Sequence, residues 1–442
     1  MEFSDLYKQS NSSLAKFSPD GQYIAVCVEH RLIIRDSENP KRIHRVCSTS
    51  YSSPFIQQIE WSANSSFIMT ASYMENQVDV WALHDESWRC TITDQVARIE
   101  EAQWAPDSQH ILTFSEYDLR LSIWDIEDES RRYVQSPKRK AGVSFHPTGP
   151  FVAVVQRHDH RDHVGIYSTG TWTLEREIPL DTVDACGVQW SPDGLHLAVW
   201  DTMANYHVCV VNVGGMIKRK YENEGLGVNR CVWSPTGQLL ALAGLDRRLR
   251  VLNSLTWRPI ATLTHRPMLS GDLDVFVESS IGGTSLANLR EHSRFDLAPL
   301  PCSVQIVVPM DAHRGASGSG AVSVAQFNAE GTLLATVCDS MPNCLWVWRV
   351  ADMRLITVIQ TLKPLRRVQW SPVEPALVFC TGVATVYLWR QNRGCHLFEI
   401  PSASSVVSSL LWNPNAGSLA LLSKGLFALA YVTEDNDDLK SS

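Results

Sequence analysis

The sequence predicts an all-β chain of the β-propeller class, and three observations support that prediction. A short motif recurs nine times at spacings of 41 to 45 residues, with a single spacing of 94. Between the motifs, apolar and polar residues alternate in short runs, which is typical of β-strands. Of the fifteen tryptophans, all except Trp200 recur at fixed places in this repeat. Four-stranded antiparallel units repeated in this way are expected to form the blades of a propeller.

The recurring motif is an aromatic residue followed by a turn of the Ser-Pro-Asp-Gly type. Proline presets φ in such a turn, and glycine and aspartate tolerate the unusual backbone angles that follow. A period of about 40–45 residues is that of the WD40 repeat. The nine motifs begin at Phe17, Trp61, Trp104, Phe145, Trp190, Trp233, Phe327, Trp370 and Trp412.

Each repeat predicts four strands in order. The first strand ends at the aromatic residue, and an apolar second strand follows the turn, as in HLAVW (196–200). The third strand alternates, as in LSIWD (121–125), and the fourth is more polar, as in WTLEREI (172–178). One blade cannot bury both of its faces alone, so the blades must stack, with indole rings filling the wedges between them.

The number of blades follows from the spacings and the two ends of the chain. Nine motifs favour one ring of eight or nine blades, with two propellers as the alternative. Residues 1–433 are expected to form the propeller, with 2–8 supplying the fourth strand that the last repeat lacks, and 434–442 to form an acidic tail. An insert at about 266–320 contains two strand-like runs, at 272–278 and 302–309, which could contribute a cryptic blade.

Composition narrows the class of protein. The net charge is −8 and the pI is about 6.0, so the chain as a whole has no charge-driven preference for nucleic acid or anionic membranes. Eleven cysteines occur without any C-x-x-C spacing, which predicts reduced thiols and a cytosolic or nuclear location. No run approaches the ~20 apolar residues of a membrane helix, and the polar N-terminus does not resemble a signal peptide.

The stretch HDHRDH (158–163) raises the question of a metal site. A three-histidine site through His158, His160 and His163 is sterically possible, but no cysteine accompanies it and nothing local makes the rings converge. The stretch lies between the second and third strands of the fourth repeat, where an exposed hairpin is expected. Asp159 or Asp162 is predicted to tighten that hairpin. We therefore expect neither a metal nor a cofactor.

The chain contains no P-loop, no G-x-G-x-x-G, no G-x-S-x-G and no H-E-x-x-H, so we expect no enzyme activity. Basic side chains cluster instead in loops that share one predicted face of the propeller. They either solvate hairpin tips or form a basic platform for an acidic protein segment. Nucleic acid is the weaker candidate partner, because the aromatic residues are committed to the core. The predicted interaction face consists of Lys138, Arg139, Lys140, Arg161, Arg247, Arg248, Arg366 and Arg367.

Several stretches go beyond the general repeat and resemble one family. They are residues 16–36, 56–69, 188–202, 249–260, 343–355 and 418–425, together with the insert after the sixth repeat. They are similar to the WD-repeat proteins of the WRAP type, which belong to centrosomes and centriolar satellites and have a fungal counterpart at the spindle pole body. The resemblance covers nearly the whole chain.

The resemblance implies a non-catalytic adaptor in the cytoplasm and cytoskeleton. Its implied partners are a coiled-coil protein similar to the synovial-sarcoma-X-breakpoint-interacting protein and, in fungi, also a minus-end-directed kinesin of the kinesin-fourteen class. The implied roles are anchoring of microtubule minus ends, spindle assembly, spindle pole integrity and ciliogenesis. Two other functions stay open from the residues alone: a propeller in translation initiation or another RNA-associated complex, and a metal-dependent enzyme that uses the HDHRDH stretch.

Overall fold

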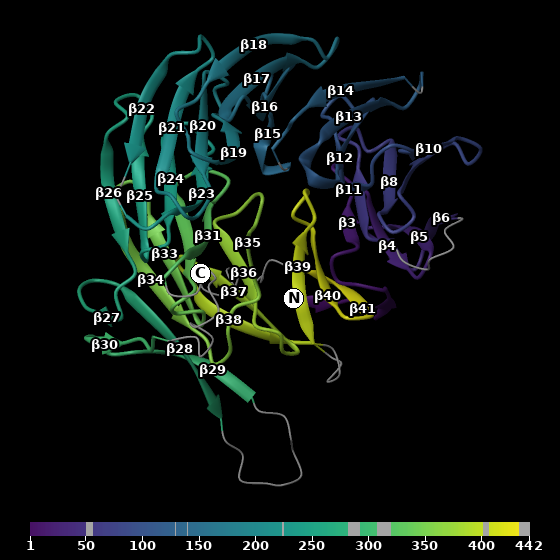
Figure 1. The fold of residues 1–442 in the computed structure, drawn as a ribbon. Coiled ribbons are helices and arrows are strands. Elements are labelled where there is room, and N and C mark those ends of the chain that lie inside the picture. Colours follow the sequence, from purple (N-terminus) through teal and green to yellow (C-terminus); the bar gives the residue numbers. More distant parts are fainter. Residues whose placement is uncertain are drawn as a thin grey trace. The chain divides into compact units, whose positions relative to one another are not determined.

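The computed structural model describes residues 1–49, 56–128, 130–138, 140–222, 225–281, 292–306, 320–400 and 406–432. Apart from the 3-10 turns η1 (Glu116–Asp118) and η2 (Lys140–Gly142), every regular element in these ranges is a β-strand. The strands form nine antiparallel blades within the described part of the chain, each built of strands consecutive in sequence except where noted below (Figure 1). The predicted all-β propeller class is confirmed, with nine blades.

One compact unit contains residues 94–277 and 296–360 and carries blades 3 to 7. Blade 3 is β11 (Ile99–Trp104), β12 (His110–Ser115), β13 (Arg120–Asp125) and β14 (Arg131–Gln135). Blade 4 is β15 (Val143–Phe145), β16 (Phe151–His158), β17 (Arg161–Ser168) and β18 (Leu174–Pro179). Blade 5 is β19 (Ala185–Trp190), β20 (His196–Asp201), β21 (His207–Asn212) and β22 (Ile217–Glu222). Blade 6 is β23 (Val228–Trp233), β24 (Leu239–Gly244), β25 (Arg248–Asn253) and β26 (Pro259–Thr264). Blade 7 is β31 (Val322–Phe327), β32 (Leu333–Cys338), β33 (Cys344–Arg349) and β34 (Arg354–Gln360).

The other unit contains residues 1–93, 278–295 and 361–442 and carries blades 1, 2, 8 and 9. Blade 1 is β3 (Ala15–Phe17), β4 (Tyr23–Val28), β5 (Arg31–Asp36) and β6 (Ile43–Ser48). Blade 2 is β7 (Gln58–Trp61), β8 (Phe67–Ser72), β9 (Gln77–Ala82) and β10 (Arg89–Thr93). Blade 8 is β35 (Arg367–Trp370), β36 (Ala376–Cys380), β37 (Thr385–Arg390) and β38 (Gly394–Glu399). Blade 9 is β39 (Val407–Trp412), β40 (Ser418–Ser423) and β41 (Leu426–Tyr431), with β1 (Glu2–Phe3) and β2 (Tyr7–Lys8).

Blade 9 takes its outer strand from the other end of the chain. Strand β1 pairs antiparallel with β41 through Glu2 and Tyr431, and β2 pairs with the same strand through Tyr7 and Phe427. The Gln9 side chain donates hydrogen bonds to the carbonyls of Ser423 and Leu426 at 2.7 and 2.9 Å. These bonds cover the edge that β41 would otherwise expose. The tail expected at 434–442 lies outside the described residues.

Burial changes across each blade in the way that the sequence pattern requires. The second and third strands are central, so both of their faces are covered, and they read as apolar runs such as β24. The fourth strand lies outermost in its blade, where charged residues protect an exposed edge. Strand β18 (LEREIP) shows this, because five of its six residues are exposed.

The turn after each first strand needs a residue with a left-handed backbone. Gly21, Gly194, Gly237 and Gly331 have φ between 70° and 72° at the last position of the motif. Where the motif lacks that glycine, Ser65, Ser108 and Ala416 adopt φ of 60°, 61° and 56°. The turn geometry is therefore kept in these degenerate repeats, at the cost of strain that glycine would avoid.

The tryptophans pack between blades as the sequence predicts. Trp61, Trp104, Trp190 and Trp233 end first strands and are only 4–6% exposed. The indole N–H of Trp190 donates to the carbonyl of Ser144 in the preceding blade at 2.9 Å. Trp200, the one tryptophan outside the repeat positions, lies over Gly187, where a Cβ atom would come within 2.2 Å of its ring.

The insert after blade 6 extends blade 7 and adds no tenth blade within the described residues. Strand β28 (Asp274–Ile281) pairs parallel with β34, and β29 (His292–Leu297) lies beyond it at the edge of a six-stranded sheet. The strand expected over 302–309 was wrong in extent. Only β30 (Cys302–Ser303) forms, pairing with β27 (Met268–Leu269), and residues 307–309 lie outside the described part.

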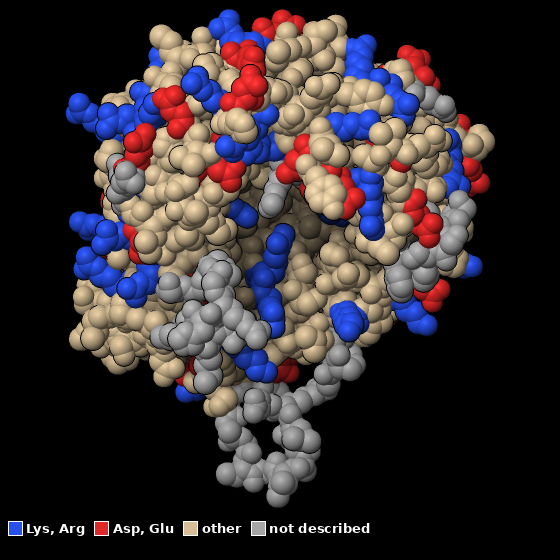
Figure 2. All heavy atoms as spheres, viewed as in Figure 1, with Lys and Arg blue, Asp and Glu red and all other residues tan. Residues whose placement is uncertain are grey.

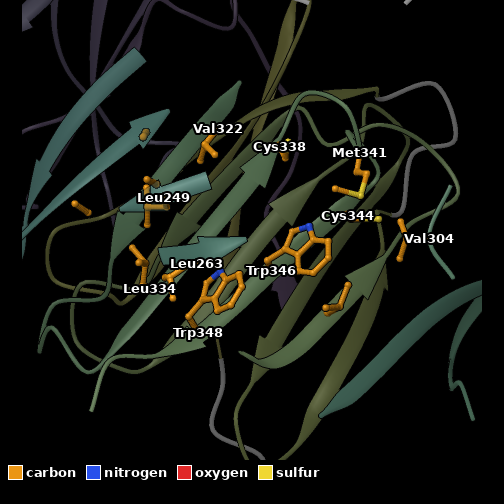
Figure 3. Close-up of a cluster of buried hydrophobic side chains, with 14 of the residues drawn as sticks. Leu249, Leu263, Val304, Val322, Leu334, Cys338, Met341, Cys344, Trp346 and Trp348 are labelled. Atoms are coloured by element: carbon orange, nitrogen blue, oxygen red, sulfur yellow. The ribbon is translucent and has the colours of Figure 1, made fainter. Parts of the chain in front are cut away.

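The insert also contributes to the core of blades 6 and 7. Leu269, Val275 and Val304 pack in one buried cluster with the indoles of Trp346 and Trp348, several members of which Figure 3 shows. Beside these rings, the buried His265 imidazole forms a hydrogen bond to the Thr336 hydroxyl, which also accepts the Trp348 indole N–H. Burial lowers the pKa of His265 to about 4, so the imidazole is neutral at physiological pH.

Candidate protein-interaction site

The basic residues of the predicted interaction face differ in their surroundings. Lys138 is engaged, because its Nζ lies 2.5 Å from Asp184 Oδ1 and 3.7 Å from the buried Asp162. Arg139 and the side chain of Lys140 lie outside the described residues. Lys138 is therefore a structural cation that holds the connection between blades 4 and 5.

The remaining predicted residues are more accessible. Arg161 and Arg248 are exposed at the starts of β17 and β25, whereas Arg247 is half-buried and donates its backbone N–H to Gly320 at 2.7 Å. Arg366 and Arg367 are exposed in the other unit. Figure 2 shows Lys and Arg interspersed with Asp and Glu over the visible face, without a large patch of one sign. The basic platform remains a prediction.

The HDHRDH stretch forms the exposed hairpin that the repeat predicts. His158 pairs with Arg161 across a two-residue turn in which Asp159 and His160 have φ of 47° and 63°. The rings of His158 and His163 lie 6.1 Å apart. Among the residues that the structure describes, no group of three or more His, Cys, Asp or Glu side chains is arranged to hold a metal ion.

Asp162 does not tighten its own hairpin, which corrects one of the two expectations for this stretch. Its carboxylate is 1% exposed and accepts hydrogen bonds from the Ala185 N–H at 2.7 Å and the Thr182 hydroxyl at 3.1 Å. Thr182 lies in the connection to blade 5, and Ala185 is the first residue of β19. The sequence suggested a local turn bond, whereas the real partners lie about 20 residues further along the chain.

A pocket of about 600 Å³ lies on this same edge of the sheets, where fourth-to-first and second-to-third connections emerge. Its lining comes from the connections around blades 5 and 6 and from the start of blade 7, all within one unit. The lining residues are Asp181, Val183, Met203, Ala204, Asn205, Tyr206, His207, Glu222, Gly225, Leu226, Gly227, Leu245, Gly320 and Ala321.

Close backbone contact shapes the wall of this pocket. A Cβ atom at Gly227 would lie 1.9 Å from the carbonyl oxygen of Met203, so only glycine lets the two connections approach so closely. The Leu245 N–H donates to the Gly227 carbonyl at 3.2 Å and fixes the third connection beside them. The rim above carries three exposed apolar side chains, Val183, Met203 and Leu226, which are 65, 46 and 63% exposed.

The polar side of the pocket is acidic. Asp181 and Glu222 have side chains that are 63 and 54% exposed, and the described lining contains no lysine or arginine. Lys220, just outside the lining, forms an ion pair with Asp181, and that hydrogen bond lowers the pKa of the Asp181 carboxyl. Glu222 Oε1 lies 3.2 Å from Nε2 of His207.

The floor of the pocket contains His207, a buried polar side chain that lacks a hydrogen-bond partner among the described residues. The His207 side chain is 9% exposed, and neither ring nitrogen makes a hydrogen bond to any residue that the structure describes. Its Nδ1 lies 3.8 Å from the fully buried Asp201, whose Oδ2 accepts the Val183 N–H at 3.0 Å. Burial raises the pKa of Asp201. Buried polar groups are normally satisfied, so this floor is unusual.

Sequence reasoning missed this pocket. Asp201 ends a second strand and His207 begins the following third strand, the same place in the repeat that the HDHRDH stretch occupies in blade 4. That shared position was the available signal. No helix in the described residues is long and apolar enough to span a membrane.

Comparisons with known proteins agree with this architecture. Residues 217–253 match the family model for the WD domain, G-beta repeat. Two solved structures share the fold: the C-terminal WD40 domain of Sif2, with a TM-score of 0.54 and 9% identity over 98% of this chain and 99% of that one, and the Dos1 propeller, with a TM-score of 0.53 and 12% identity over 97 and 94%.

Two curated relatives share sequence as well as fold. An uncharacterized WD repeat-containing protein of Schizosaccharomyces pombe is 24% identical over 68% of this chain and 66% of its own length. The mouse WD repeat-containing protein WRAP73 is 34% identical over 98% of this chain and 96% of its own length. An identity of this size over nearly the whole of both lengths shows that the chain belongs to the WRAP73 family of WD repeat-containing proteins.

Proposed function

We propose that this chain is a non-catalytic scaffold at microtubule-organising centres, where it works in a complex with a coiled-coil protein. The observation that carries the proposal is the end-to-end similarity to WRAP73. The WRAP-type resemblance implies that the complex anchors microtubule minus ends and supports spindle assembly, pole integrity and ciliogenesis. A partner similar to the synovial-sarcoma-X-breakpoint-interacting protein, with a kinesin of the kinesin-fourteen class, fits this role.

The structure supports a scaffold through the placement of its accessible groups. The strands form a close-packed frame, and the connections at the sheet edges carry further exposed apolar side chains, among them Val183, Met203 and Leu226. A rigid frame that presents variable loops is a common design for protein recognition. WD-repeat propellers are familiar as binding platforms, and the pocket beside blades 5 and 6 gives this one a shaped recess.

Proximity labelling and immunoprecipitation of the full chain from dividing cells test the proposal. We expect a coiled-coil spindle-pole or satellite protein among the strongest specific partners, and a tagged chain that concentrates at spindle poles. Depletion should change spindle length and loosen minus-end focusing. A diffuse chain that recovers no such partner would contradict the proposal, and co-sedimentation with ribosomal subunits would favour the RNA-associated alternative.

The predicted basic face can be tested in the same cells. Arg161→Glu combined with Arg248→Glu reverses two exposed charges in one unit, and we expect weaker partner recovery if that face binds an acidic segment. Lys218→Glu is the matched control, because this exposed lysine lies near the opposite end of its blade. Equal recovery by the double variant, the control and the unmodified chain would remove the basic face from the proposal.

A further inference from the structure

The pocket beside blades 5 and 6 has a charge and a shape that indicate what it binds. Its exposed carboxylates, Asp181 and Glu222, face a recess without a lysine or arginine in its described lining. Lys220 already neutralises Asp181, so Glu222 is the carboxylate whose charge is least compensated. A ligand that enters here is favoured if it brings a cation.

The floor provides a second and independent indication of a ligand. His207 is buried and lines the pocket, yet neither ring nitrogen has a hydrogen-bond partner among the described residues. The carboxylates on either side of it are within ion-pair distance, at 3.2 Å for Glu222 and 3.8 Å for Asp201. A cationic donor placed beside Glu222 would pair with this carboxylate and lie next to the unpartnered ring nitrogen Nε2 of His207, which is 3.2 Å from Glu222.

The apolar rim of the pocket indicates that a ligand also brings an apolar group. Val183, Met203 and Leu226 expose large apolar side chains around one opening, which is typical of a protein-interaction site. Methionine is well suited to such a rim, because its flexible side chain adapts to different partners. The volume of about 600 Å³ falls within the usual range of roughly 300–1,000 Å³ for binding pockets, and it suits a few side chains of an extended segment.

We propose that this pocket binds a short segment of a partner protein in which a lysine or arginine side chain is flanked by an apolar side chain. The cation pairs with Glu222 over His207, and the apolar neighbour packs on Val183, Met203 and Leu226. The inference rests on the proposed scaffold function and adds the chemistry of one partner segment. The segment proposed for this pocket is basic, whereas the segment expected at the predicted basic face is acidic.

The test starts from purified full-length protein and a displayed library of random twelve-residue peptides. We expect the selected peptides to be enriched in Lys or Arg next to Leu, Ile, Met or Phe. A fluorescein-labelled copy of the strongest peptide then gives affinities by fluorescence polarisation. Enrichment of acidic or purely apolar peptides, or no enrichment at all, would overturn the inference.

Four variants give the affinity measurement its specificity. We expect Glu222→Arg to weaken the affinity for the labelled peptide by more than about tenfold and Glu222→Gln by about threefold. Reversal of the charge adds repulsion to the lost attraction. Lys220→Met should strengthen binding about threefold, because it releases Asp181. Lys218→Met, which removes a neighbouring exposed lysine outside the pocket lining, is the matched control and should leave affinity unchanged.

Other outcomes separate this inference from the scaffold function. If Glu222→Arg binds the labelled peptide as well as the unmodified chain does, with the same melting temperature, the pocket is not the binding site. If the purified protein selects no basic peptide and yet recovers its coiled-coil partner from cells, the pocket inference fails and the scaffold function stands. If the basic peptide binds and no spindle-pole protein is recovered from cells, the pocket inference stands and the scaffold function fails.

Discussion

Two buried aspartates hold the same connection between blades 4 and 5, and their surroundings differ in charge. Asp162 accepts hydrogen bonds from Thr182 and Ala185, and it has Lys138 Nζ at 3.7 Å and an Arg157 guanidinium nitrogen at 3.6 Å. We call Asp162 with Lys138, Arg157 and Asp184 the paired junction. Its buried carboxylate is compensated by two cations, as the low-dielectric interior requires.

Asp201 accepts the Val183 N–H from the same connection and has no lysine or arginine partner among the described residues. We call Asp201 with His207 and Glu222 the pocket junction. The two carboxylates come from different positions in the repeat, because Asp162 lies near the start of a third strand and Asp201 ends a second strand. Lys138 and Arg157 meet only the first of them. Beside Asp201, His207 and Glu222 line the pocket, whereas Asp162 is enclosed by its ion pairs and hydrogen bonds.

The largest effect is expected from the packing that supports the two junctions. Trp190 belongs to the core of blades 4 and 5 and Trp233 to that of blades 5 and 6. Replacing either with alanine should lower the free energy of unfolding by about 3–5 kcal/mol, because a cavity remains. Urea unfolding measures this, with Leu255→Ala as the control, since Leu255 is 87% exposed. A loss below about 1 kcal/mol would show that the indoles do not support the blades.

The comparison is tested most directly by removing each buried charge. Asp162→Asn leaves Lys138 and Arg157 without their shared anion and should cost about 2–3 kcal/mol of unfolding free energy. Asp201→Asn keeps an oxygen that accepts the Val183 N–H and removes an uncompensated charge, so it should change stability by less than about 1 kcal/mol. Equal losses in the two variants would mean that the junctions do not differ as the structure indicates.

The pH dependence of stability should distinguish the junctions as well. Because burial raises the pKa of Asp201, the folded protein holds this proton more tightly than the unfolded chain does. The contribution of Asp201 to the free energy of unfolding is therefore greatest in acid, and it falls as the pH rises above the ordinary aspartate pKa of about 3.9. Relative to the unmodified chain, Asp201→Asn should become more stable between about pH 4 and neutrality.

Two neighbouring groups must be controlled in that measurement. His207 Nδ1 faces Asp201 at 3.8 Å and favours its ionised form when protonated, whereas the charge of Asp162 opposes it. Measuring the effect of Asp201→Asn in a His207→Gln background removes the histidine from the difference. If the difference in unfolding free energy does not depend on pH, the Asp201 carboxyl is not perturbed by burial in the folded protein.

The sequence predicted those parts of the molecule that depend on near neighbours. The turn motif requires a left-handed residue one position after Asp20 or Asp193, and the structure places glycine there with positive φ. The indole positions, the hairpin at Asp159 and the polar outer strands also follow from local pattern. All of these features are set by residues within one repeat, so the sequence of a single repeat is enough to predict them.

Features that depend on distant pairing could not be predicted in this way. Lys138 lies 46 residues from Asp184, and Asp162 lies 23 residues from Ala185, so the sequence suggested a free basic cluster and a local turn bond. Strand β28 pairs in parallel with β34, about 80 residues later, which no repeat of period 40–45 implies. The pocket arises from five connections that meet only in the folded protein.

The smallest effect on stability is expected at Glu222, and it completes the distinction between the two junctions. Its side chain is 54% exposed, so its interaction with His207 is screened by solvent and Glu222→Gln should change the unfolding free energy by less than about 0.5 kcal/mol. The same variant should weaken a bound basic peptide about threefold. Urea unfolding and fluorescence polarisation on one protein preparation measure both. If Glu222→Gln lowers the unfolding free energy by more than about 1.5 kcal/mol, Glu222 stabilises the fold, as Asp162 does. The two junctions would then differ only in the exposure of their side chains.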